Sequence, residues 1–471
     1  MILKSLSLAN FRGFDQIELE FDSKRTVIAG VNGIGKSGVL RALTVALSHL
    51  LPRMTDCQED VVSFVDDDIK LEKPQLEVSA IFAVARKRLH VDGVRQHVDY
   101  AALESHRKKL AEVRAKIADA KKDRKTIPLK RLQREEEGLV ALIAEEPERW
   151  NILLEQRSED ESAPELSNEG AAALVSTLKA RPAHPIFVYF STSRYQKVRS
   201  RKLSDPAPHE KMAAYQDAFN EEAKSYRFFL DWFRAQKELK GPGRAKRLSL
   251  LKAIETAAAE FVEGIKNFRV EYEPRVQFLV EKNGQTLSLN QLSDGERGLL
   301  ALVFDIARRL AIANPEADDP IKEGRGIILI DEIELHLHPR WQRKVLRQLS
   351  TTFPKCQFIV TTHSPQVIGQ SKPEQLRLLK KTTRGIRQKA VGQSFGMDSN
   401  WILEEIMGTP SRDHAIENKL REITDAIDDE DLSNARSLIA ELEDEVGLFP
   451  DLQEWKSMLD RLELLKPDEM D

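Results

Sequence analysis

The sequence predicts an α/β fold in which a mixed, mainly parallel sheet is flanked by helices, interrupted by a helical insertion and followed by a helical tail. Three observations predict it. An apolar strand at 25–30 passes through a glycine-rich turn into a helical pattern at 37–51. Between 297 and 381, apolar runs of strand length alternate with helical patterns, as in parallel sheets. After Trp401 the apolar residues recur at helical spacing.

The predicted strands and helices follow from local patterns. Asp92-Gly93 is a dipeptide typical of tight turns, so we expect a hairpin to turn there between its two strands. The other helices of the core are expected at 297–313 and 340–352. The expected strands lie at 2–8, 17–21, 25–30, 76–84, 88–100, 184–192, 268–274, 326–334, 357–365 and 376–381.

These elements suggest a split head with an insertion. The first strand–turn–helix and the later parallel strands read as parts of one sheet, so we expect a head made of 1–100 and 265–395. Residues 101–264 are then a mainly helical insertion, with a short helical hairpin around Pro128. An acidic helical region, 396–471, follows the head, and its helices are expected at 413–427, 431–446 and 449–465.

Composition is that of an ordinary globular chain. Of the 471 residues, 41% are hydrophobic and 31% are charged, which is typical of a chain with more than one packed unit. No apolar run reaches the ~18–20 residues that cross a bilayer, and the start lacks the layout of a secretion signal. With only Cys57 and Cys356, no disulfide framework or cysteine-based metal site is expected. We expect a cytoplasmic protein without membrane contact.

Charge is unevenly distributed along the chain. Residues from Glu404 onward carry 21 Asp and Glu against 7 Lys and Arg, whereas residues 1–403 carry 55 against 65. The stretch 104–134 alone has 12 basic and 4 acidic residues. A basic body can contact the phosphates of DNA and an acidic tail can contact a basic partner. A well-solvated surface and a structural helical cap explain the same charges about as well.

The octet GVNGIGKS predicts a loop that binds a polyphosphate. Its glycines let the backbone amides point inward toward phosphate oxygens, at the start of a helix. Its lysine is placed to reach the β- and γ-phosphates, and its serine hydroxyl is placed to ligate Mg²⁺. The predicted nucleotide-binding residues here are Gly30, Val31, Asn32, Gly33, Ile34, Gly35, Lys36 and Ser37.

A second anchor follows the apolar run Ile327–Ile330. A buried strand that ends in Asp331-Glu332 places the first carboxylate toward Mg²⁺ and the second toward the attacking water of a hydrolysis. Two further stretches flank Asp331-Glu332 in the sequence, one before it and one after it. Ser293 and Gly295 lie in LSDGE at the start of a helix, and His363 ends the strand-like VTTHSP.

Together these motifs resemble those of ABC-type ATPases of the Rad50/SMC/RecF kind. The resemblance implies an ATPase head that uses ATP and Mg²⁺, with Glu332 and His363 as catalytic residues. It implies that Ser293, Gly295 and Glu296 contact the nucleotide held by a second copy, so that a homodimer or higher homo-oligomer forms. Leu8–Phe14 is similar to the N-terminal motif of RecF- and Rad50-like proteins, which implies that Arg12 lies near the nucleotide.

Two later stretches narrow the resemblance. Glu334–Pro339 resembles the extended loop that follows the strand-end carboxylates in the OLD/RecF-like branch of these ATPases. Residues 395–412 look like the segment that follows the ATPase core in Septu PtuA-like proteins. The latter resemblance implies an antiviral defence function, with DNA contact and a partner HNH nuclease encoded alongside. A RecF-like repair ATPase and a self-sufficient nuclease are the alternatives. A fused Toprim nuclease would need a Glu and an Asp-x-Asp on later strands, and only helices are predicted there.

The chain departs from the family pattern in places. No clear glutamine loop follows the first helix, and a solvated turn is the favoured interpretation of Asp66, Asp67 and Asp68. His336 and His338 are interpreted as residues of a subunit interface rather than of a transition-metal site. Residues 101–180 contain no Cys, which argues against a zinc hook.

Overall fold

The computed structural model contains two compact units, 1–397 and 398–471. Among the residues that it describes, no helix is long and apolar enough to span a membrane. Those residues are 1–57, 61–97, 100–122, 131–138, 148–156, 165–195, 211–220, 226–238, 241, 244–271 and 277–465.

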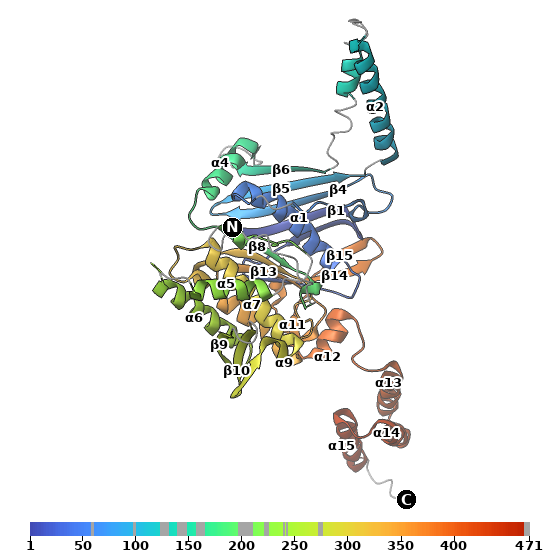
Figure 1. The fold of residues 1–471 in the computed structure, drawn as a ribbon. Helices are drawn as coiled ribbons and strands as arrows, with labels where there is room; N and C mark the ends of the chain where they lie inside the picture. The colour runs from blue at the N-terminus through green and yellow to red at the C-terminus, as the bar shows by residue number, and fades with distance from the viewer. Residues whose placement is uncertain are drawn as a thin grey trace, which may run out of the picture. The chain divides into compact units, whose positions relative to one another are not determined.

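The first unit is built on a six-stranded, mainly parallel sheet, which confirms the predicted fold class (Figure 1). Five strands are parallel and the edge strand β15 is antiparallel to β14. The strands β3, β12, β13 and β8 carry almost only buried residues because both faces of this sheet are covered. In spatial order they are β15 (Gly385–Lys389), β14 (Leu376–Thr382), β3 (Arg25–Ala29), β13 (Cys356–Thr362), β12 (Gly326–Ile330) and β8 (Ile186–Phe190).

A second, antiparallel sheet lies on the other side of helix α1 (Lys36–Met54). Figure 1 shows α1 between the two sheets. Buried residues occur all round this helix, as expected of a helix with a sheet on each side. The strands of the second sheet are, in spatial order, β2 (Phe14–Glu20), β1 (Ile2–Phe11), β4 (Gln75–Val84), β5 (Lys87–Gln96), β6 (Glu148–Gln156) and β7 (Glu165–Ser167).

The expected hairpin turn at Asp92-Gly93 is wrong. The chain turns at Ala85-Arg86 instead, with Ala85 at a φ of 56°, and β5 runs straight through Gly93. A Cβ atom at Gly93 would lie 2.6 Å from the ring of Trp150 on β6. This glycine therefore makes room for an aromatic ring across the sheet and does not form a turn.

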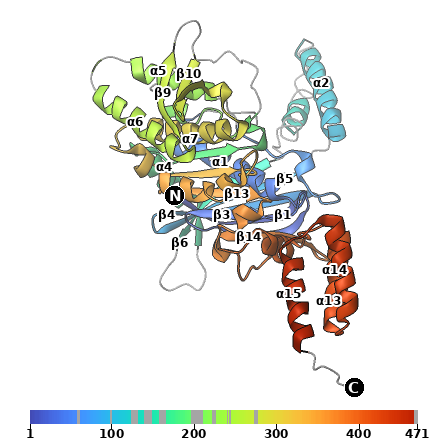
Figure 2. The same ribbon diagram turned by 90° about the horizontal axis from the view of Figure 1, so that it is seen from below.

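Helices on the far side of the parallel sheet surround α7 (Asp294–Ala313), in which 17 of 20 residues are buried. Figure 2 shows α5, α6 and a three-stranded sheet gathered on one side of the head. That sheet consists of β9 (Ile265–Glu271), β10 (Gln277–Lys282) and β11 (Gln285–Ser288). The helices that contact α7 are α5 (Tyr226–Glu238), α6 (Arg244–Phe261) and α8 (Pro320–Glu323). Helix α4 (Asn168–Lys179) packs instead on α1 and β6, and α10 (Val345–Thr352) packs on α6 and β13. The short helices α9 (Pro339–Gln342) and α11 (Pro365–Ile368) also belong to this unit.

The range expected as an insertion, 101–264, shares both sheets of the head. Within it, β6 pairs with β5 and β8 pairs with β12. Helix α2 (Tyr100–Lys122) packs on a second helical stretch, 131–138, through an apolar cluster and an Arg114–Glu136 ion pair of 2.8 Å. Pro128, the expected joint of the hairpin, lies outside the described residues.

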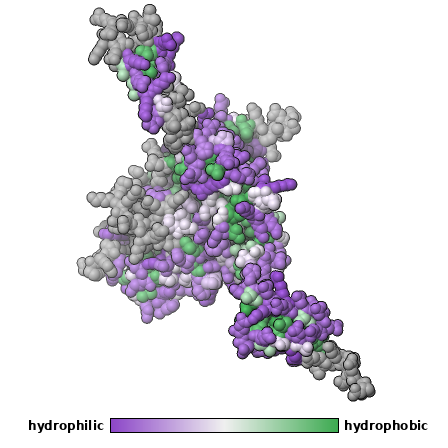
Figure 3. All heavy atoms as spheres, turned by 90° about the vertical axis from the view of Figure 1, so that its right-hand side faces the viewer, coloured by the Kyte–Doolittle hydropathy of each residue, from purple (hydrophilic) through white to green (hydrophobic). Residues whose placement is uncertain are grey.

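The second unit is helical, and its three long helices match those predicted. A short α12 (Ser399–Trp401) and a π-helical turn, Ile402–Met407, precede them. The core is made of leucine, isoleucine and alanine side chains from all three long helices. Its surface is mainly hydrophilic, with an apolar patch (Figure 3). The three helices are α13 (His414–Asp428), α14 (Leu432–Val446) and α15 (Pro450–Leu465).

Candidate functional site

The predicted phosphate loop joins β3 to α1, at the carboxyl edge of the parallel sheet. Ala29 of β3 pairs with Thr362 of β13, and Ile330 of β12 pairs with Val360. The residues that follow these strands therefore leave the sheet at one edge, where ligands of such sheets bind. The register places the phosphate loop beside Asp331 and His363.

Two glycines of the loop are required by close contacts and by backbone conformation. Gly35 has a φ of 99°, and a Cβ atom there would lie 2.7 Å from the Phe14 ring. Gly30 has a φ of 150°, and a Cβ atom there would lie 2.7 Å from the carbonyl oxygen of Leu379. A side chain at either place would distort the loop.

Lys36 is buried at the start of α1. Its Nζ donates to the carbonyl oxygens of Gly30 at 2.8 Å and Val31 at 3.1 Å. Burial lowers the pKa of Lys36, while the nearby carboxylates of Glu332, Glu334 and Asp331 act in the opposite direction. The helix has no side-chain cap and no acidic residue in its first turn. Its first amides are therefore available to an anion.

Asp331 meets Ser37 across the site. The Ser37 hydroxyl donates to Asp331 Oδ1 at 3.1 Å, and Thr361 donates to the same oxygen at 2.5 Å. The next residue, Glu332, has a φ of 44° and donates its backbone N–H to Thr361 Oγ1 at 2.8 Å. A hydroxyl and a carboxylate side by side are oxygen ligands of the kind that Mg²⁺ takes together with phosphates.

His363 lies beside a second carboxylate, that of Glu334. The backbone N–H of His363 donates to Glu334 Oε1 at 2.7 Å. Among the described residues, no group of three or more His, Cys, Asp or Glu side chains is arranged to hold a metal ion. The histidines at 336 and 338, which are exposed, thus form no such cluster.

The LSDGE stretch forms the start of α7. Ser293 caps the helix and Glu296 completes a capping box: Ser293 Oγ accepts the backbone N–H of Glu296 at 3.4 Å, and Glu296 Oε2 accepts that of Ser293 at 3.1 Å. Lys282 donates to the other oxygen of Glu296 at 2.5 Å. A Cβ atom at Gly295 would lie 2.4 Å from the carbonyl oxygen of His336. This corner therefore packs on the loop that follows Asp331 and Glu332.

Arg12 lies on the turn between β1 and β2 and pairs with Asp68. Its Nε donates to Asp68 Oδ1 at 2.8 Å, and Arg41 of α1 holds the same carboxylate at 3.0 Å. Asp68 is fully buried, so a solvated acidic turn is the wrong interpretation of this residue. Asp66 makes an ion pair of 2.8 Å with Arg95.

Sequence reasoning missed several residues that shape the site. The sequence indicates only a strand at Thr361, and it carries no signal for the ion pair of Arg41 and Asp68, because these residues are distant in the chain. For Glu334, a signal existed: it lies three residues after Asp331, in a loop that the motif pattern had already marked.

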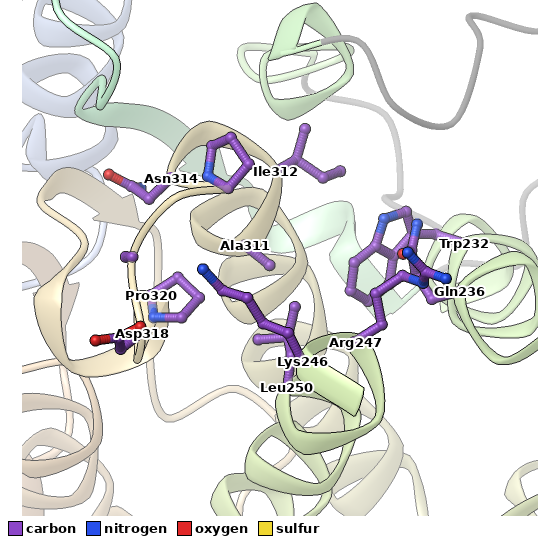
Figure 4. Close-up of a pocket in the computed structure, with 12 residues that line it drawn as sticks. Trp232, Gln236, Lys246, Arg247, Leu250, Ala311, Ile312, Asn314, Asp318 and Pro320 are labelled. Carbon is purple, nitrogen blue, oxygen red and sulfur yellow. The ribbon is translucent and has the colours of Figure 1, made fainter. Parts of the chain in front are cut away.

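A separate cavity lies at the other end of α7 (Figure 4). Because α7 has 20 residues and a helix rises ~1.5 Å per residue, a cavity at its C-terminal end lies far from Ser293 at its start. It contains none of the predicted site residues. Its lining comes from α5, α6, the last turn of α7 and the segment that follows it, and includes Trp232, Gln236, Lys246, Arg247, Leu250 and Asn314.

Comparison with known proteins gives several similar chains. The Retron Ec83 probable ATPase of Escherichia coli is 43% identical over 34% of this chain and 29% of its own length. The Retron Vc95 probable ATPase of Vibrio cholerae is 45% identical over 27% of this chain and 25% of its own length. The Septu protein PtuA of Bacillus mycoides is 44% identical over 16% of this chain and 10% of its own length. The matches thus span less than a third of each of these relatives.

Among solved structures, the SMC head bound to the C-terminal winged-helix domain of ScpA has a TM-score of 0.46 and 13% identity, over 83% of this chain and 98% of that chain. The model of one protein family, described as an AAA ATPase domain, matches residues 1–368. This match covers most of the 471 residues and every predicted site residue. The chain belongs to the AAA ATPase domain family.

Proposed function

We propose that this chain binds ATP with Mg²⁺ and hydrolyses it to ADP and phosphate. One observation carries the proposal: Ser37 and Asp331, 294 residues apart in sequence, meet at 3.1 Å beside the phosphate loop. Family membership supports ATP binding. Ser37 and Asp331 would hold Mg²⁺, which neutralises phosphate charge when bound.

The residues of the site would divide the work of hydrolysis. Lys36 would exchange its two carbonyl partners for β- and γ-phosphate oxygens, joined by the amides of the loop. Glu332 would take a proton from the attacking water, whose oxygen bonds to the γ-phosphorus as the bond to the bridging oxygen breaks. His363 would contact the γ-phosphate. Arg12 would lie near the nucleotide, at the edge of the site.

The composite part of the site would come from a second copy. In this proposal Ser293, Gly295 and Glu296 of one copy approach the ATP that is held by Lys36 of another. ATP binding would then draw two heads together, and hydrolysis would release them. The change of geometry would be the output of the protein.

The biological setting that we propose is antiviral defence, in which the ATPase controls a partner HNH nuclease that acts on DNA. The similarity to retron ATPases and to PtuA supports this proposal. The basic stretch on α2 supports DNA contact, because Lys and Arg neutralise phosphates without reading sequence. A RecF-like repair ATPase is the second candidate, favoured by 35% identity to a RecF protein over 15% of this chain.

Steady-state ATP turnover of the purified chain tests the enzymatic proposal. Glu332→Gln should lower turnover about 100-fold or more while ATP binding persists, because the carboxylate acts on water and not on the nucleotide. Unchanged turnover in this variant would exclude Glu332 as the base.

A plasmid-cleavage assay tests the division of labour with the partner. The chain alone should leave the plasmid intact with Mg²⁺ or Mn²⁺, and addition of the HNH protein encoded beside its gene should produce cleavage. Cleavage by the chain alone would favour a nuclease, and a neighbourhood without an HNH gene would favour the RecF-like candidate.

A further inference from the structure

We propose that Glu334 is a positioning residue. It orients the His363 imidazole toward the nucleotide and decides which of the two ring nitrogens carries the proton. The proposal rests on the ATPase function proposed above, and it adds a residue that lies outside the predicted catalytic set. It is carried by the contacts of one buried carboxylate.

Glu334 is buried directly behind His363. Its side chain is only 6% exposed, whereas that of His363 is 42% exposed. Oε1 of Glu334 accepts the backbone N–H of His363 at 2.7 Å and lies 3.1 Å from the ring atom Nδ1. One carboxylate therefore holds the backbone of the histidine and faces its ring.

The contact with the ring is close but not aligned. At 3.1 Å it is short enough for a hydrogen bond, yet Nδ1 of His363 makes none within the described part of the chain. The same holds for Oε2 of Glu334. A small rotation of the imidazole would let Nδ1–H donate to the carboxylate.

A purely structural role does not account for a charge at this place. The backbone bond to His363 needs only one acceptor oxygen, which the amide of a glutamine would supply. Burying a carboxylate with one unpaired oxygen instead costs desolvation free energy. A negative charge beside Nδ1 has a use, because it favours the tautomer of the ring whose proton is on that nitrogen.

The position of the pair fits an action on the phosphates. Thr362, which precedes the histidine, pairs with Ala29, which precedes the phosphate loop. Glu334 is also among the carboxylates that counter the effect of burial on the pKa of Lys36. With Nδ1 held by Glu334, Nε2 is the ring atom left to face the nucleotide, as with partners that orient other functional histidines.

The test is a double-mutant cycle on the full chain, read as ATP turnover. Glu334→Gln keeps the size and the acceptor for the backbone N–H, and should lower kcat about tenfold to 100-fold with KM near that of the parent. In the His363→Ala background the same change should have no further effect. Glu441→Gln, on an exposed position of α14, is the matched control and should leave kcat unchanged.

A second readout does not depend on catalysis. In ¹⁵N NMR spectra of the chain, with His363→Ala used to assign the signal, Nδ1 of His363 should carry a proton in the parent and lose it in part in Glu334→Gln. Additive losses of kcat in the cycle, or an unchanged ring signal, would overturn the proposal. If the parent chain turned over no ATP, the ATPase proposal would fail, whereas the ring signal would still decide the role of Glu334.

Discussion

Helices α1 and α7 both begin at a corner proposed to meet phosphate, and they begin in opposite ways. α1 starts at Gly35, without a side-chain cap and without an acidic residue in its first turn. α7 starts at Ser293, with a capping box and with Asp294 and Glu296 in its first turn. The first helix end is open to an anion, whereas the second is capped and its two acidic residues are paired with Arg297 and Lys282.

This difference fits the different tasks proposed for the two motifs. Open amides and the helix dipole favour an anion at the start of α1. The start of α7 offers fewer open amides, because Ser293 accepts from the backbone of Glu296. In the proposed shared site, the α7 corner therefore has the lesser task of completing a site in which another loop already holds the phosphates.

The largest effect that separates the two corners is expected at the phosphate loop. Lys36→Ala should weaken binding of a fluorescent ATP analogue about 100-fold or more, because the variant loses the cation that faces the phosphates. Lys372→Ala, at a side chain that is 57% exposed, is the control and should bind like the parent. If Lys36→Ala bound the ATP analogue as tightly as the parent, the phosphate loop would not be the corner that holds the nucleotide.

A change at the other corner should spare binding and stop turnover. Ser293→Ala should leave analogue binding by a single head near the parental level, while turnover falls because the second copy cannot complete the site. Loss of the cap should lower the free energy of unfolding by about 0.5–2 kcal/mol. A comparison of binding and turnover on the same sample checks this prediction, and a loss of binding would contradict it.

Gly295 tests the contact between α7 and the loop after β12. Gly295→Ala brings a Cβ atom to 2.4 Å from the carbonyl oxygen of His336, so the two segments must separate. We expect a loss of about 1–3 kcal/mol in the free energy of unfolding, measured by urea denaturation. Gly392→Ala meets nothing within 4 Å and is the control. Equal stability of both variants would mean that the corner yields easily.

The smallest expected effect is on the pH dependence of stability. Burial raises the pKa of Glu296, but the bonds from Lys282 and Ser293 outweigh it, so the pKa is lowered from its usual 4.5. Because the folded state favours the charged form, this stabilisation is present above pH 4.5 and is lost as the pH falls through the lowered pKa. Glu296→Gln should reduce that acid sensitivity in urea midpoints, and parallel curves for both proteins would contradict it.

The sequence carried much of the site because its main signals are local. Gly30, Lys36 and Ser37 lie in one octet between a strand and a helix, and Asp331 follows an apolar strand. Each position at the end of a parallel strand can be predicted from its local pattern, and such strand ends meet at one edge of the sheet. The capping box of Ser293 is also readable from sequence, since the two residues lie three apart.

Contacts between distant segments could not be predicted in this way. The burial of Asp68 depends on Arg12 and Arg41, which approach it only in the folded chain. The turn expected at Gly93 was wrong because a ring on another strand, that of Trp150, decides what this glycine does. Turn and solvent-exposure propensities describe a residue by its type, whereas the burial of Asp68 and the conformation at Gly93 depend on side chains from distant parts of the sequence.

The most direct measurement of a shared site is the solution mass of Glu332→Gln by light scattering, with saturating ATP and Mg²⁺ and with ADP. The account predicts that ATP doubles the mass found with ADP, and that adding Ser293→Ala to the same chain prevents the doubling. A mass that is the same with ATP and ADP, or a doubling that Ser293→Ala leaves intact, would contradict it.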